Sequence, residues 1–187
     1  MPTLVRAGVR RALQSILDGG LTEVDEVICV VDMELADPDK EDELRWTAKD
    51  IGLPVRIETP FIKKAKPGYP SELRNFAHEL AVGEFITYMD DDDVYTPGAL
   101  ATIKERVAEH PGRAGVFRIR YPNGTLRWKE PKKYRSNVGG HCIVPPNLPG
   151  LPPWLPMGHA GTQHVEDCAR KFAPAVWHED VIVELRP

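Results

Sequence analysis

Four adjacent aspartates, Asp90 to Asp93, are the part of the sequence with the most evident chemistry. Carboxylates this close repel one another unless a positive charge lies among them. Alternate side chains of an extended segment share a side, so Asp90 and Asp92 can face one ligand while Asp91 and Asp93 face another. Carboxylate oxygens suit Mg²⁺ or Mn²⁺, which commonly bind through one or two carboxylates together with substrate phosphates. The run therefore predicts a divalent metal site that serves a phosphorylated ligand.

Two other interpretations of the run are a solvated acidic turn and a calcium-binding EF-hand loop. The EF-hand pattern fails because Val94 and Thr96 take the fifth and seventh loop positions and no glycine takes the sixth. A solvated turn is common in general. Here, however, the run follows the apolar segment Phe85 to Met89 and precedes a helix start at Thr96-Pro97. This context favours a functional site.

The elements that must position the run follow from hydrophobic periodicity. Residues 9 to 110 alternate between helical and strand-like patterns, with Ser71 expected to cap the third helix. Helices are expected over Val9–Leu17, Leu44–Ile51, Ser71–Ala81 and Thr96–Val107, and strands over Glu26–Val31, Pro54–Glu58 and Phe85–Met89. The alternation predicts an α/β fold with a mostly parallel sheet, where ligands bind beyond the carboxyl ends of the strands.

The second half of the chain has a different pattern. Half of the residues from 145 to 156 are proline, which excludes a helix or central strand and indicates a stiff, extended loop. The other expected elements are a hairpin of Val116–Tyr121 and Thr125–Lys129, a strand around Val138–Val144, a short helix over Val165–Phe172 and a strand over Val176–Leu185.

Composition and charge exclude several classes of protein. The chain has 187 residues and a net charge of −4, so it can form one core and has no overall attraction to nucleic acid or membrane. No apolar run could span a bilayer, and the first residues lack the apolar core of a secretory signal. Three widely spaced cysteines form no disulfide framework. We therefore expect one cytoplasmic domain over residues 1–187.

The segment SELRNFAHELAVGEFITYMDDDDVYTPGAL resembles the centre of the family 2 glycosyltransferases, which have the GT-A fold. The family pattern comprises a serine, Arg-Asn, Ala-x-Gly-Glu, an apolar strand, Asp-x-Asp-Asp and a later proline. The residues that match it in order are Ser71, Arg74-Asn75, Ala81 to Glu84, Asp90 to Asp93 and Pro97. Upstream, Pro2-Thr3 and Arg6 resemble the family's Pro-Thr-x-x-Arg opening, and EVICVVD resembles its second strand, which ends in Asp32.

The resemblance implies a Rossmann-like sheet flanked by helices, with a small mixed β region on the acceptor side. Residues 1–112 would bind the nucleotide sugar and residues 113–187 the acceptor. One departure concerns the apolar strand that usually precedes Pro-Thr, because here Met1 precedes Pro2 directly. Either the chain begins late or residues 1–5 supply a shortened strand.

The resemblance also implies roles for single residues. Thr3 and Asp32 would hold the base, Arg6 would belong to the nucleotide-sugar site, and Arg74 would lie near the nucleotide or diphosphate. Asp90 or Asp91 would touch the ribose, and Asp92, with Asp90, would carry Mn²⁺ or Mg²⁺. Without the aspartate run, Asp32 would be interpreted as a turn residue and Arg74 as half of a surface ion pair.

Sugar transfer with inversion needs a general base on the acceptor hydroxyl. The family commonly supplies it from a Glu-Asp pair, which Glu166-Asp167 in QHVEDCARKF resembles. Asp167 is the predicted base and Glu166 the second candidate. The alternative is acidic charge that complements a helix N-terminus. Among the histidines, whose spacings fit no compact zinc pattern, His178 is the predicted additional metal ligand, although a hydrogen-bonded histidine is also consistent.

The resemblance therefore predicts a metal-dependent, inverting transferase with a nucleotide-diphosphate sugar as donor, most simply a UDP-sugar. The acceptor and oligomeric state are left open. One alternative is a non-catalytic nucleic-acid-binding module that uses the basic residues and aromatics of 118–135, a stretch that could equally be a solvated hairpin face. The other is a nucleotidyltransferase that makes nucleotide sugars, which needs an N-terminal glycine-rich loop that PTLVRAG does not provide.

Overall fold

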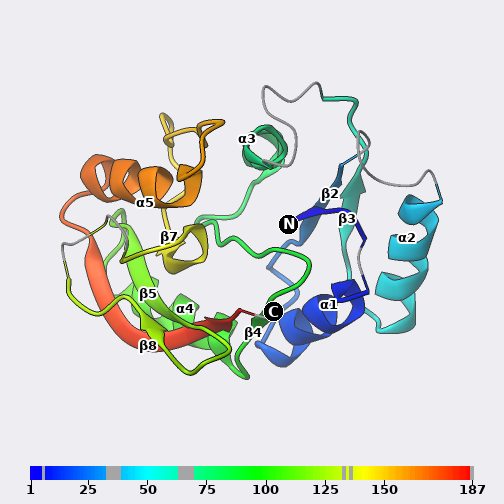
Figure 1. Ribbon diagram of the computed structural model, residues 1–187, viewed down its shortest axis with the longest axis horizontal. Helices are drawn as coiled ribbons and strands as arrows, with labels where there is room; N and C mark the ends of the chain where they lie inside the picture. The colour runs from blue at the N-terminus through cyan, green and yellow to red at the C-terminus, as the bar shows by residue number, and fades with distance from the viewer. Residues whose placement is uncertain (6, 33–38, 63–69, 132–133, 135–136, 186–187) are drawn as a thin grey trace.

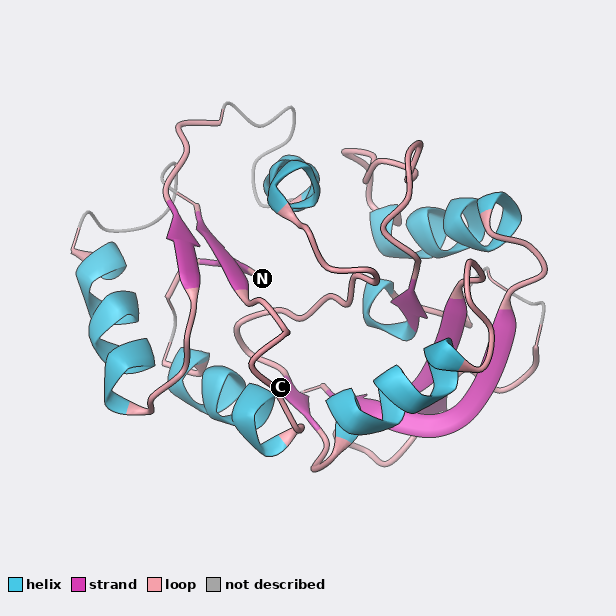
Figure 2. Ribbon diagram, turned by 180° about the vertical axis from the view of Figure 1, so that it is seen from behind, coloured by secondary structure: helices cyan, strands magenta, loops and turns pink. Residues whose placement is uncertain are grey.

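In the computed structural model, residues 1–5, 7–32, 39–62, 70–131, 134 and 137–185 are described. They form two sheets with helices around them (Figures 1 and 2). The helices are α1 (Val9–Asp18), α2 (Lys40–Asp50), α3 (Ser71–Leu80), α4 (Ala99–Ala108) and α5 (Ala160–Lys171), with the 3₁₀ turn η1 (Gly140–Cys142). The strands are β1 (Pro2–Thr3), β2 (Ile28–Val31), β3 (Arg56–Glu58), β4 (Val94–Tyr95), β5 (Gly115–Arg120), β6 (Leu126–Arg127), β7 (Ile143–Val144) and β8 (Val176–Glu184).

The first sheet is parallel, in the order β1-β2-β3. Its central strand is fully apolar and carries buried Val30 and Val31, as expected for a strand covered on both faces. Thr3 pairs with Val31, so the carboxyl ends of β1 and β2 lie at one edge. The residue after β2 is Asp32, whose backbone N–H donates to the carbonyl of Thr3 at 3.0 Å. This edge is where a parallel sheet binds ligands.

The second sheet is mixed, in the order β4-β8-β5-β6 with β7 also paired to β5. β8 and β5 are parallel, whereas β4, β6 and β7 run antiparallel to their partners. Helix α4 packs on β8, and α5 packs against η1. The expected hairpin and the last strand are therefore confirmed, and β4 connects the end of the aspartate run to β8.

The expected strand Phe85–Met89 is wrong. Phe85 makes an isolated bridge to Pro146, and Ile86 donates to the carbonyl of Pro145 at 3.0 Å. A cavity of about 660 Å³ lies between this segment and the Val27–Ile28 end of the first sheet. The short strand β1 pairs with the carboxyl-terminal half of β2, and no strand of the described residues pairs with residues 86–89. An apolar sequence can form a strand only where a neighbouring strand is available to pair with it.

Three other expected boundaries differ from the structure for local reasons. Ser71 does not cap α3, because Pro70 takes the N-cap position and Ser71 is the first helical residue. The Ser71 hydroxyl donates instead to the carbonyl of Leu155 at 2.9 Å. Helix α4 begins at Ala99, since the hydroxyl and N–H of Thr96 bond to β8 and Gly98 adopts φ 74° before the helix. In place of the strand expected over residues 138–144, residues 140–142 form η1 and residues 143–144 form β7. Gly140 of η1 packs against the Trp154 ring so closely that a Cβ there would lie 2.3 Å from it.

Helix α5 begins at Ala160, five residues before the expected start at Val165. Glu166 and Asp167 therefore lie in the middle of the helix. Acidic charge that complements a helix dipole acts within the first turn, so that interpretation of the pair does not apply. Among the described residues, no helix is long and apolar enough to cross a membrane.

Candidate functional site

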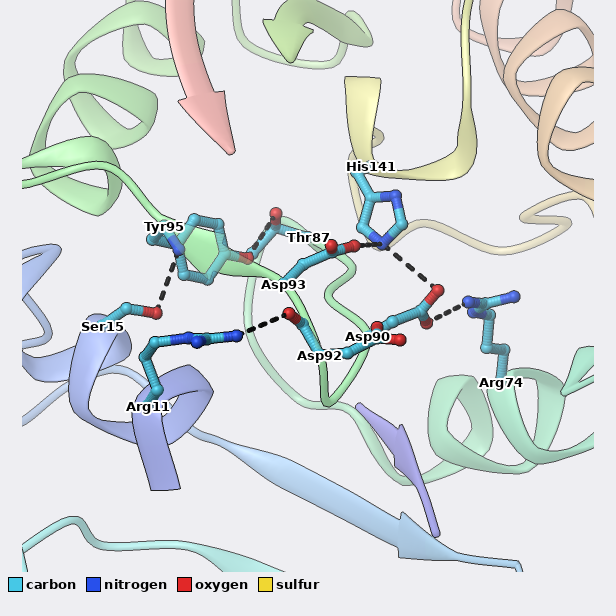
Figure 3. A network of polar contacts seen from close by, with 9 residues as sticks. All are labelled: Arg11, Ser15, Arg74, Thr87, Asp90, Asp92, Asp93, Tyr95 and His141. Carbon is cyan, nitrogen blue, oxygen red and sulfur yellow. Dashed lines mark hydrogen bonds and ion pairs between the residues drawn. The ribbon is translucent and has the colours of Figure 1, made fainter. Parts of the chain in front are cut away.

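The aspartate run lies where the two sheets meet, and its side chains do not share one environment. Figure 3 shows Asp90 between Arg74 of α3 and His141 of η1. One carboxylate oxygen of Asp90 forms an ion pair with Nη2 of Arg74, and the other lies 3.4 Å from Nε2 of His141. Asp93 approaches the same imidazole nitrogen, with Oδ2 3.4 Å from Nε2. Two carboxylates thus meet at one histidine nitrogen, and a guanidinium pairs with one of them.

Electrostatics in this group favour the charged forms. Burial opposes ionisation of Asp90, but Arg74 and His141 outweigh it and hold the pKa of the carboxyl well below its usual range. Burial likewise opposes protonation of His141, yet the carboxylates of Asp90 and Asp93 raise its pKa. The Nε2 atom of His141 is nevertheless buried and makes no hydrogen bond of acceptable geometry among the described residues. A buried nitrogen beside two carboxylates is suited to a cation.

Asp90, Asp93 and His141 form a donor set that could hold a metal ion. One ligand atom from each lies within 4.8 Å of the others. Among the described residues, these three side chains are the ones close enough together to share a metal ion. Two carboxylate oxygens and one imidazole nitrogen suit Mn²⁺ or Mg²⁺ better than a soft metal. The residues present therefore fit the predicted class of cofactor, with His141 rather than His178 beside the aspartates.

Asp91 connects the run to the edge of the first sheet. Its Oδ2 accepts the Thr3 hydroxyl at 2.7 Å and the Leu4 N–H at 2.9 Å, and its side chain is almost completely buried. Val5, which has φ 53°, donates its N–H to the Thr3 hydroxyl at 2.7 Å. This conformation is rare for a β-branched residue, and the Thr3 contact stabilises it. Thr3, Asp32 and Asp91 are thus brought together at one edge.

Asp92 contacts helix α1 through its backbone. Its backbone carbonyl accepts a hydrogen bond from Arg11 of α1 at 3.4 Å (Figure 3). Gly8, which precedes α1, lies so close that a Cβ there would sit 3.1 Å from the Asp91 carbonyl. The N-terminus of α1 therefore abuts the run, and helix N-termini favour negative charge. Arg6, which was predicted to contact the nucleotide sugar, lies outside the described residues.

The predicted bases lie on α5, the helix that packs against η1 and hence against the segment carrying His141. Asp167 accepts hydrogen bonds from Gln163 at 2.9 Å and from Arg170 at 3.2 Å. Glu166 forms an ion pair with the same Arg170 at 2.7 Å. Both carboxylates remain partly exposed, so solvent or an acceptor can reach them.

His178 lies on β8 and does not belong to the Asp90–Asp93–His141 group. Its ring stacks on Phe117 of β5 with centroids 4.6 Å apart. Burial lowers the pKa of His178, and the charged groups acting on it are on or beside α4 and β8, among them Asp180 and Arg106. The structure thus surrounds this histidine with the second sheet and α4.

Two of the described basic residues in the stretch 118–135 form ion pairs with acidic residues of β8. Arg118 pairs with Glu179 and lies over the buried Trp128 ring, and Arg120 pairs with Glu184. The indole N–H of Trp128 donates to the Val116 carbonyl at 3.2 Å. A buried, hydrogen-bonded Trp128 offers no face for stacking on a base, which removes one support for the nucleic-acid alternative.

The two sheets, and a cluster of acidic residues at the carboxyl edge of the parallel one, define a GT-A fold. The family model for glycosyl transferase family 2 matches residues 1–167, and the chain belongs to this family. No curated protein sequence matches the chain.

Solved structures with low identity share the fold. TarS of S. aureus superposes with a TM-score of 0.76 at 14% identity, covering 100% of this chain and 36% of TarS. TarS 1–349 in complex with UDP-GlcNAc gives 0.71 at 16% identity, covering 98% of this chain and 56% of that one. The mannosyltransferase PcManGT of Pyrobaculum calidifontis, in complex with GDP-Man and Mn²⁺, gives 0.70 at 17%, covering 98% and 54%. The chain therefore spans about a third to somewhat over half of these proteins.

Proposed function

We propose that the chain is a metal-dependent glycosyltransferase that moves a sugar from a nucleotide-diphosphate sugar to an acceptor hydroxyl with inversion. The single observation that carries this proposal is the Asp90–Asp93–His141 donor set beside Arg74. A divalent cation bound there would neutralise the charge that develops on the leaving diphosphate, so no acid residue is needed at that oxygen. Arg74, whose guanidinium is already ordered by Asp90, would add positive charge to the same region.

Three residues at the sheet edge support a nucleotide site on the opposite side of Asp90. Thr3 and Asp91 are hydrogen-bonded to each other, and Asp32 follows the neighbouring strand. We propose that Asp32 and Thr3 contact the base, that Asp90 or Asp91 contacts the ribose, and that Arg6 belongs to the same site. UDP is the simplest expectation, because TarS 1–349 binds UDP-GlcNAc, while PcManGT binds GDP-Man.

The nucleotide and the metal can be tested together. We expect UDP, GDP or dTDP to raise the melting temperature only when Mn²⁺ is present, because the cation links the carboxylates to the diphosphate. A thermal-shift panel with each nucleotide, with and without Mn²⁺, measures this. Asp93→Asn should abolish the metal-dependent shift, and the exposed Asp50→Asn is the matched control. No response to any nucleotide would sink the proposal.

The same panel resolves which aspartate binds the cation. The spacing of the run predicts Asp92 with Asp90, whereas proximity to His141 favours Asp93 with Asp90. If Asp92→Asn keeps the metal-dependent shift and His141→Asn loses it, the ligands are Asp90, Asp93 and His141. The reverse result assigns the metal to Asp92, as the resemblance implies.

Asp167 is proposed to take the proton from the acceptor hydroxyl. Its hydrogen bonds from Gln163 and Arg170 hold the carboxylate in one orientation, which a base requires. We expect Asp167→Asn to reduce transfer by about 100-fold or more while nucleotide binding is unchanged. Turnover of a UDP-sugar and the nucleotide thermal shift measure these separately, with Glu166→Gln as the matched variant. If Glu166→Gln alone loses transfer, Glu166 is the base.

A further inference from the structure

A second pocket, of about 270 Å³, lies between the beginnings of α3 and α5. Ser71 and Arg74 line it from α3, Arg127 from β6, and His159, Gly161 and Thr162 from the start of α5. None of the described residues that line it is acidic, although the chain as a whole has a net charge of −4. The pocket is thus a local concentration of positive charge in an acidic protein.

The two arginines have hydrogen-bonding capacity to spare. The Arg74 side chain is only 9% exposed and its Nη2 pairs with Asp90, but its Nε is buried and has no hydrogen-bond partner among the described residues. A buried N–H without a partner is costly, so a ligand oxygen that accepts from it would bind favourably. Arg127 makes one hydrogen bond among the described residues, to the Val138 carbonyl at 3.4 Å, and a guanidinium has five N–H donors.

Two helices begin at the pocket. Neither α3, with ten residues, nor α5, with twelve, has a side-chain hydrogen bond that caps its N-terminus. Helix N-termini present free N–H groups and partial positive charge, and they bind anions for both reasons. Ser71, the first residue of α3, directs its hydroxyl proton to the Leu155 carbonyl and accepts no hydrogen bond from the N-terminus of α3.

The position of the pocket relates it to the aspartate cluster. A Cβ at Gly161 would lie 2.8 Å from the backbone nitrogen of Gly140, so the start of α5 touches the residue before His141. Arg74 lines the pocket and also pairs with Asp90. Helix α5, which begins at the pocket, carries Asp167 seven residues, or about two turns, after its first residue. An anion in this pocket would therefore lie beside the proposed metal site, at the start of the helix that carries the proposed base.

We propose that this pocket binds a phosphoryl group carried by the acceptor. The inference rests on the proposed transferase function and adds a chemical class to the acceptor that receives the sugar. The oxygens of a phosphoryl group can accept from Arg127, from the Nε of Arg74 and from the N–H groups of Gly161 and Thr162 in the first turn of α5, since the N–H of Ala160 already donates to the Met157 carbonyl at 3.0 Å.

Inorganic phosphate is the probe for the first test. We expect titration calorimetry to detect phosphate binding to the full chain without nucleotide or metal, and Arg127→Gln to weaken it about tenfold or more, because a charged hydrogen bond is lost. Arg120→Gln, on the same hairpin but paired with Glu184, is the matched control and should bind phosphate as the wild type does. Arg127→Lys, which keeps the charge and loses the planar fork, should lie between them. Equal affinities in wild type and Arg127→Gln would overturn the proposal.

A second arm separates acceptor phosphate from donor diphosphate, which share their chemistry. The titration is repeated with saturating UDP and Mn²⁺. If the pocket serves the acceptor, phosphate binds with the same dependence on Arg127 in their presence. If UDP and Mn²⁺ abolish phosphate binding, the pocket belongs to the donor and the assignment is wrong. If UDP and Mn²⁺ do not bind at all, the transferase proposal fails, whereas the dependence of phosphate binding on Arg127 is still measured.

Discussion

Two histidines lie near Arg74, His164 buried and His141 with a 13% exposed side chain, and the protein shifts their pKa values in opposite directions. His141 lies between Asp90 and Asp93, whose carboxylates raise its pKa against the effect of burial. His164 lies among aromatic rings, where burial lowers its pKa to about 3. The Trp154 ring stacks on it at 4.3 Å and the Tyr88 hydroxyl lies 3.0 Å from its Nε2. The comparison shows that neighbouring charge decides the state of a buried histidine where charge is present, and desolvation decides it elsewhere.

Arg74 connects the two environments. On one side it forms an ion pair with Asp90, and on the other its guanidinium lies 4.3 Å from the Trp154 ring. Trp154 is fixed in turn by Asn75, which donates to its carbonyl at 2.9 Å and accepts from its N–H at 2.7 Å. The proline-rich loop is therefore tied to α3, and it provides the aromatic face that orients Arg74. The charged and aromatic regions share this one cation.

Removal of this shared cation should have the largest effect. We expect Arg74→Ala to lower the free energy of unfolding by about 2–3 kcal/mol, because Asp90, whose side chain is 33% exposed, loses its charged hydrogen bond to the buried guanidinium. Trp154 also loses the guanidinium stacked on it. Urea denaturation at pH 7, without metal or nucleotide, measures the change.

The matched control for Arg74 is Arg10, which pairs with Asp50 at 2.6 Å where both side chains are about 60% exposed. Arg10→Ala should cost about 1 kcal/mol or less, since exposed ion pairs contribute little. Similar losses in the two variants would show that burial of the Asp90 pair does not matter. The claim that Arg74 connects the charged and the aromatic regions would then be wrong.

The sequence predicted the parts of the fold whose information is local. Apolar periodicity and glycine stops gave α1 and α3 closely, whereas α2 begins at Lys40, four residues before the expected Leu44. The turn at Asn123-Gly124 gave the hairpin of β5 and β6. Phe85–Met89 failed because a strand needs a partner, and the presence of a cavity beside the segment is a tertiary property. Ser71 failed as a cap because Pro70 takes the N-cap position, and its hydroxyl bonds instead to Leu155, far away in the sequence.

In the candidate site, too, some contacts could be predicted from the sequence and others could not. Arg74 and Asp90 are near in sequence and fall within one family pattern, so their association could be predicted. His141 belongs to a Gly-Gly-His segment about fifty residues beyond the aspartates, and no spacing rule connects the two. Gly140 was the available signal, because its lack of a side chain allows the tight turn η1 to approach Trp154. His178 has similar sequence surroundings to a ligand, yet it packs on Phe117.

His164, the histidine among aromatic rings, predicts that the stability of the protein depends on pH. His164 is 1% exposed, and its folded pKa of about 3 lies below the unfolded value near 6.5. The unfolded chain therefore binds more protons between these values, so stability falls as the pH drops below about 6.5. Between pH 7 and 5 this one group should cost about 2 kcal/mol. His78, whose pKa is lowered to about 4 by burial and by Arg74, contributes in the same direction.

The measurement is urea denaturation at pH 7 and pH 5 for the wild type, His164→Gln and His159→Gln. His164→Gln removes the titrating group, so it should be less stable than the wild type at pH 7 but lose about 2 kcal/mol less on acidification. His159 is exposed, so His159→Gln should keep the wild-type pH dependence. If His164→Gln and the wild type lose the same free energy, His164 does not stay neutral in the folded protein. Both histidines would then accept a proton in the folded protein, and His164 would differ from His141 only in the residues that surround it.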